Sequence, residues 1–103
     1  MRQVFERFLG VRNLSFYFPY ALAILPEQFD SNDFIAAFAF QQQRAYIRAL
    51  SIVEWETPPF QTVNENLIQW LAESELVEQV GTRESENLFK QVCVVAVWKK
   101  VGR

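Results

Sequence analysis

The chain has 103 residues, half of them apolar and 16% aromatic, with a formal net charge of −2 and no histidine. This length allows one domain with a modest core, and the apolar fraction argues against a disordered chain. With no histidine and a single cysteine, Cys93, zinc sites and Cys–His catalysis are excluded. The three glycines are scattered, so there is no Gly-rich phosphate loop. We therefore expect no metal and no cofactor.

The first 29 residues are interpreted as an extension packed on the core. Residues 2–9 have the apolar spacing of a short amphipathic helix, with Gly10 as its C-cap. Residues 14–25 are largely apolar, but Pro19 interrupts them and they fall short of the roughly 20 residues that a membrane span needs. We expect no membrane partner. Cys93 lies in an apolar run, which predicts a buried, reduced thiol and suits a cytoplasmic protein.

Three helices are predicted in the middle of the chain, at residues 31–41, 43–55 and 60–75. Asp30 or Ser31 can cap the first helix, whose inward residues are Phe34, Ile35 and Phe38. The second places Tyr46, Ile47, Leu50 and Val53 on one face. Pro58 and Pro59 end it and start the third helix, with either Thr57 as the cap or a capping box from Thr62 to Glu65.

The third helix leads directly into a predicted antiparallel hairpin. Residues 76–80 form the first strand, residues 81–87 a polar turn, and residues 88–98 the second strand, with 76–80 paired to 92–98. The order of helices and hairpin predicts a single α+β domain, mainly α. The predicted domain is a three-helix winged helix-turn-helix at residues 30–103 with a C-terminal β-hairpin wing, and the extension at residues 1–29 precedes it.

A family resemblance rests on several short motifs between residues 30 and 100. They are Phe34-Ile35 with Phe38, Tyr46 with Leu50, Phe60-Gln61-Thr62-Val63 with Ile68 and Leu71, Ser85-Glu86-Asn87-Leu88-Phe89, and Trp98-Lys99. In these positions the chain resembles a group of small bacterial winged-helix proteins. The resemblance implies a three-helix unit with a wing, in a superfamily whose members mostly contact DNA, and it carries over no catalytic residue.

In that fold the helix beginning near Phe60 would enter the major groove. Amide side chains on it can read adenine edges, and cations near the wing and at the tail can contact phosphates. These candidate nucleic-acid contacts are Gln61, Asn64, Gln69, Arg83, Lys90, Lys99 and Lys100. Residues 54–86, however, carry eight glutamates and one arginine, a net charge of −7, which repels a phosphate backbone.

Two non-catalytic functions therefore stay open. One is a nucleic-acid-associated or transcription-accessory module with weak, salt-sensitive DNA binding. The other is a protein–protein interaction or dimerisation domain that keeps the winged-helix scaffold without binding DNA. An enzyme is not expected, because the only acid/base candidates are carboxylates that are local in sequence and face no evident cleft. They are Glu54, Glu56, Glu73, Glu75 and Glu78.

The strand at residues 92–98 is apolar at every position, so both of its faces favour burial. Either the aromatic segment at residues 14–18 covers the second face, or another chain does. The second explanation predicts a homodimer, since two-fold pairing is the commonest closed assembly. Its candidate interface residues are Phe16, Tyr17, Tyr20, Val95, Val97 and Trp98.

Overall fold

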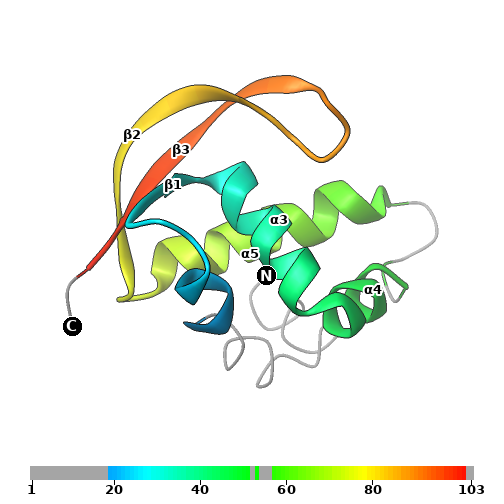
Figure 1. The fold of residues 1–103 in the computed structure, drawn as a ribbon. Helices are drawn as coiled ribbons and strands as arrows, with labels where there is room; N and C mark the ends of the chain where they lie inside the picture. Colours follow the sequence, from blue (N-terminus) through cyan, green and yellow to red (C-terminus); the bar gives the residue numbers. More distant parts are fainter. Residues whose placement is uncertain (1–18, 52, 54–56, 102–103) are drawn as a thin grey trace.

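The computed structural model describes residues 19–51, 53 and 57–101. The predicted helix at residues 2–9, Phe16, Tyr17, Glu54 and Glu56 lie outside the described residues. A helical segment at residues 19–23 comes first. It is followed by β1 (Gln28–Asp30), α3 (Ser31–Gln41), α4 (Gln43–Ser51), α5 (Pro59–Glu73), β2 (Val77–Glu86) and β3 (Val92–Lys100), as Figure 1 shows. The predicted coarse class, α+β with an antiparallel hairpin after the helices, is confirmed.

The bounds of α3 are those predicted, because a capping box fixes its start. The Asp33 N–H donates to the Asp30 carboxylate at 2.8 Å, and the Asp33 carboxylate accepts from the Asp30 N–H at 3.0 Å. The helix then buries Phe34, Ile35 and Phe38, as its apolar spacing predicts. In α4 the prediction was wrong for Ile47, which is exposed, while Tyr46 is buried.

Two prolines, rather than a side-chain cap, begin α5. Pro58 is the N-cap residue and Pro59 the first helical residue, and no side-chain cap hydrogen bond is present among the described residues. Both capping predictions, for Thr57 and for Thr62, were therefore wrong. The helix ends at Glu73, two residues before the predicted end, where the Ser74 N–H bonds the Leu71 carbonyl.

The sheet has the order β1-β3-β2 and is antiparallel throughout. Strand β1 was not predicted. It pairs with the C-terminal half of β3, with Phe29 opposite Trp98. The predicted division of the chain between residues 29 and 30 falls inside this strand, so residues 28 and 29 belong to the sheet.

The predicted turn at residues 81–87 was wrong. Residues 81–86 continue β2 and pair with residues 92–97 of β3, after a β-bulge between Gln79 and Gly81. The chain reverses at Asn87–Gln91 instead. The polar side chains of residues 82–86 are compatible with a strand because this part of the hairpin stands away from the core.

The core lies between the helices and the base of the hairpin. Phe29, Phe34, Phe38, Leu67 and Leu71 are fully buried in it. Val97 and Trp98 are also buried, and the Trp98 indole N–H donates to the Ser31 hydroxyl at 2.9 Å. These two predicted interface residues are thus already buried within their own chain. Cys93 was predicted to be buried but is exposed, because it lies on the distal half of β3.

Candidate binding groove beneath the hairpin

The distal half of the hairpin leaves the core and arches over the helices (Figure 1). Along β3, Trp98 is buried, Ala96 is half-buried and Val94 is 68% exposed. The apolar face of the strand therefore continues past the end of the core. Two sets of contacts, one at the middle of the hairpin and one at its tip, hold this arch to the helices.

The middle of the hairpin is held by an ionic clasp, formed by Arg83, Asp30 and Asp33. The Arg83 guanidinium contacts the Asp30 carboxylate through Nε at 2.9 Å and the Asp33 carboxylate through Nη2 at 3.1 Å. Beside it the Asn32 amide donates to the Ser85 hydroxyl at 3.2 Å. The clasp joins the start of α3 to β2, so it fixes how the hairpin leaves the body.

Asp30 is the buried member of the clasp, only 2% exposed. Burial, the largest single influence, raises the pKa of the Asp30 carboxyl. Hydrogen bonds from the Asp33 N–H, Ser85 and Arg83, together with the Arg83 charge, outweigh it and hold the pKa of Asp30 below its usual value. Asp30 is therefore ionised at neutral pH.

The tip of the hairpin is a pre-organised turn that rests on α5. The Asn87 carboxamide oxygen accepts from the N–H groups of Phe89 at 2.8 Å and Gln91 at 3.0 Å. Lys90 completes the turn in the left-handed region, at φ 66°. The Phe89 ring lies edge-on to Phe60 with a centroid distance of 4.9 Å. This contact closes the far end of the arch.

Between the clasp and the tip lies a groove of about 730 Å³, bounded by α3, the first half of α5 and the distal hairpin. This volume falls in the usual range of ligand sites. Its apolar lining residues are Ile35, Phe60, Ile68, Phe89, Val94, Val95 and Ala96. Its polar lining residues are Ser31, Asn32, Gln61, Asn64, Glu65, Asn87, Gln91 and Cys93. Glu65 is the one charged residue among those described as lining it.

Two residues with amide side chains on α5, Asn64 and Gln61, line the groove. Each forms a hydrogen bond within the chain through one of its two polar atoms. The Asn64 oxygen accepts from the Tyr46 hydroxyl at 2.6 Å, and the Gln61 amide donates to Glu65 at 3.2 Å. Burial raises the pKa of Tyr46, although its hydrogen bond to Asn64 acts in the opposite direction, so the phenol stays a neutral donor. Within the described residues, the Asn64 Nδ2 donor and the Gln61 Oε1 acceptor have no partner.

Two further residues with amide side chains, Asn32 on α3 and Gln91 at the hairpin tip, line the groove. Asn32 donates to Ser85 and, at 3.8 Å, to the Cys93 sulfur, and Gln91 accepts from the Asn87 amide at 3.1 Å. Among the residues that the structure describes, the Asn32 oxygen and the Gln91 Nε2 group have no partner. Four residues that line the groove thus carry two donors and two acceptors without a partner among the described residues.

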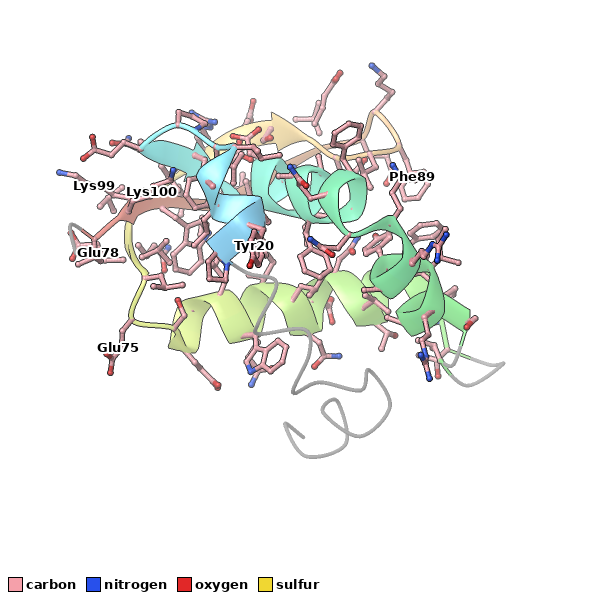
Figure 2. The ribbon with its side chains drawn as sticks, turned by 60° about the horizontal axis from the view of Figure 1, so that its bottom comes forward. Tyr20, Glu75, Glu78, Phe89, Lys99 and Lys100 are labelled. Carbon is pink, nitrogen blue, oxygen red and sulfur yellow. The ribbon has the colours of Figure 1, made fainter. Side chains whose placement is uncertain are left out.

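The predicted nucleic-acid contacts do not form one surface. Gln61 and Asn64 line the groove, Arg83 is in the clasp, and Gln69 is exposed on α5 outside the groove lining. Lys90 lies at the hairpin tip, next to Phe89. Figure 2 shows Lys99 and Lys100 at the opposite end of the molecule from Phe89.

One of the two lysines at that end has a hydrogen-bond partner within the chain. The Lys100 ammonium donates to the Leu25 carbonyl at 2.7 Å, and Lys99 lies opposite Glu78 in the strand register. Of the predicted interface residues, Tyr20 is half-exposed and Val95 lines the groove. The carboxylates of Glu73, Glu75 and Glu78 are exposed near the same end and are not part of the groove.

Of the fifteen residues that line the groove, sequence reasoning had singled out three, Gln61, Asn64 and Val95. The twelve that it missed include Asn32, Asn87, Phe89 and Gln91. The position of the turn at the hairpin tip could have been predicted from Asn87, because Asn is favoured at the first position of a turn. Nothing in the sequence pairs Phe89 with Phe60, because the contact joins residues 29 positions apart through the curvature of the hairpin.

In the part of the chain that the structure describes, no cluster of three metal-ligating side chains is present. The helices within residues 19–51 and 57–101 include none that is long and apolar enough to cross a membrane. Comparisons with protein-family models, with curated proteins and with solved structures found no match.

Proposed function

We propose that this protein is a non-catalytic binding module on a winged-helix plan, which recognises a protein partner through the groove beneath its hairpin. The observation that carries the proposal is the chemistry of the groove. Seven of its fifteen described lining residues are apolar, the others are polar, and Glu65 is the only charged residue among them. Nucleic-acid binding depends instead on cations that face the ligand.

The winged-helix plan is supported by the order of the elements. A short strand precedes the helices, the last helix leads into two strands, and the returning strand pairs with the first. In this plan α5 is the helix that would read a base sequence. Its amides Gln61 and Asn64 share the groove with hairpin residues, and a groove of this volume accommodates a peptide or a small molecule rather than a duplex.

A second candidate function, weak duplex binding, is favoured by cations outside the groove. Lys90 at the hairpin tip and Arg44 and Arg48 on α4 are exposed. They are the surface charges that such a footprint would use, because Arg83 is already paired with two aspartates.

A neutral apolar dye, Nile red, tests the groove. Its fluorescence is expected to rise with the wild-type protein and to lose most of that rise with Val94→Glu, which places a charge in the groove. The matched control is Ile47→Glu, since Ile47 is exposed to nearly the same extent but does not line the groove. Equal dye binding by both variants would contradict the proposal.

Fluorescence anisotropy with random duplex DNA at low salt separates the two candidates. The proposal predicts no binding at micromolar protein concentration. Binding that weakens steeply as salt rises, and that is lost in Lys90→Ala or Arg48→Ala, would favour the second candidate.

A further inference from the structure

We infer that the groove binds an extended peptide segment of a partner protein, neutral or basic in charge, with apolar side chains on alternate residues. This inference rests on the proposed function, since it names the ligand of the same groove. Three independent features of the groove point to this ligand: its free hydrogen-bonding groups, the arrangement of its apolar walls and its charge.

The free amide groups match a peptide backbone. Asn64 and Gln91 each present an unpaired N–H donor, and Gln61 and Asn32 each present an unpaired carbonyl acceptor, within the described residues. An extended backbone offers N–H and C=O groups in equal number, so it can satisfy both kinds. A lipid chain or an apolar small molecule would leave these groups without partners, at a cost in affinity.

The apolar walls match a strand-like conformation. Ile35 and Ile68 contribute from the helices, and Val94 contributes from β3 on the opposite wall. Successive side chains of an extended segment point to opposite sides, so alternate residues can be apolar and enter the groove while the others stay in water. Val94 is 68% exposed in the free protein, the highest exposed fraction among the apolar residues that line the groove, so such a residue would cover it.

The charge near the groove favours a neutral or basic segment. Glu65 lies in the lining, and Glu84 and Glu86 lie on β2 directly opposite Val94 and Val92. No Lys or Arg lines the groove among the described residues. An acidic segment would therefore be repelled, whereas lysine or arginine at the outward positions would be attracted.

Peptide display on the full chain tests the inference. The probe is a library of random decapeptides, selected once against the wild-type protein and once against Val94→Glu. Enriched sequences are expected to alternate apolar residues with neutral or basic ones. Synthetic copies should bind the wild-type and Ile47→Glu proteins equally and bind Val94→Glu at least tenfold more weakly, measured by fluorescence anisotropy.

Recognition of the backbone is tested by replacing single peptide amides with esters, which removes one N–H with little change of shape. Esters at one or two positions should weaken binding about three- to tenfold, as expected for a lost hydrogen bond. Unchanged affinity for every ester analogue would overturn the inference. Cys93 gives a second readout, since the only cysteine of the chain lines the groove and is exposed. Bound peptide should slow its alkylation.

The outcomes separate this inference from the proposed function. One outcome is that Nile red enters the groove while no selected peptide loses affinity in Val94→Glu. In that case the groove is a binding site, but the inference that its ligand is a peptide is overturned. If neither binds, the proposed function itself fails. A dimer by light scattering that disappears in Val94→Glu would show that a second copy fills the groove, which also overturns the inference.

Discussion

The two halves of the hairpin use the same kind of residue for different purposes. At the base, Val77, Val97 and Trp98 are buried among the helices and β1. Nearer the tip, Val94 and Val92 are mostly exposed, although β3 is apolar without interruption from Val92 to Trp98. Strand β3 is longer than the core beneath it, so the apolar residues of its distal half lie outside the core. Such residues are available for binding rather than needed for folding.

The largest expected difference between the halves is in stability. Trp98→Ala removes a buried ring and its hydrogen bond to Ser31, so we expect a loss of about 3–5 kcal/mol in the free energy of unfolding. Val94→Ala should change it by less than about 0.5 kcal/mol. Urea denaturation measures both values. A loss for Val94→Ala as large as that for Trp98→Ala would place the distal half in the core after all.

A smaller effect is expected at the junction of the halves, where the clasp lies. Arg83→Ala leaves the buried Asp30 carboxylate without its ion pair, and we expect a loss of about 1–3 kcal/mol. The side chain of Arg83 is half-exposed, so the loss stays below that of a fully buried pair. Glu84→Ala, at the next position on β2, is the matched control and should be close to neutral. Equal effects of the two variants would mean that the clasp does not stabilise the fold.

Acid should weaken the same junction. The pKa of Asp30 is lower in the folded than in the unfolded chain, so the unfolded chain binds more protons between the two values. The stabilisation from Asp30 is therefore complete above the unfolded pKa, near 4, and is lost as pH falls through the folded value. Urea midpoints from pH 7 to pH 2 measure it. Asp30→Asn should be less stable at neutral pH and show a shallower acid decline, whereas parallel curves would exclude this carboxyl as the cause.

The smallest effect is expected at the tip. Lys90 has a φ of 66°, where a side chain is strained and glycine is not. We expect Lys90→Gly to raise the free energy of unfolding by about 0.5 kcal/mol, since release of strain exceeds the added entropy of the unfolded chain. Lys90→Ala removes the same charge but keeps the Cβ atom, so it should give no gain. If both variants are equally stabilised, loss of the charge rather than the backbone is responsible.

The starts of the helices could be predicted closely because their signals are local, whereas α4, predicted to reach residue 55, ends at Ser51. The bounds of α3 follow from the Asp30 capping box and the spacing of Phe34 and Phe38, and the start of α5 follows from two prolines. Strand β1 could not be predicted, since three residues carry no periodicity and the strand exists only through its pairing with residues 97–99.

The turn was misplaced because Gly81 and the polar residues after it have the composition of a loop. In the structure Gly81 adjoins a bulge, and the polar residues continue a strand whose partner supplies the apolar side chains. The groove was not predictable for a related reason. It is created by the curvature of the hairpin and by the contact of Phe89 with Phe60, neither of which leaves a pattern in the sequence.

The order of the strands has a consequence for biosynthesis. The central strand, β3, is made after every other described element, yet β1 pairs with no other described strand. Until residues 97–99 leave the ribosome, Phe29 lacks its strand neighbour Trp98, which lies opposite it in the sheet. We therefore expect this domain to complete its core only after translation of the last strand. A nascent chain stalled before that point would expose an open core and an unpaired strand edge to chaperones or to aggregation.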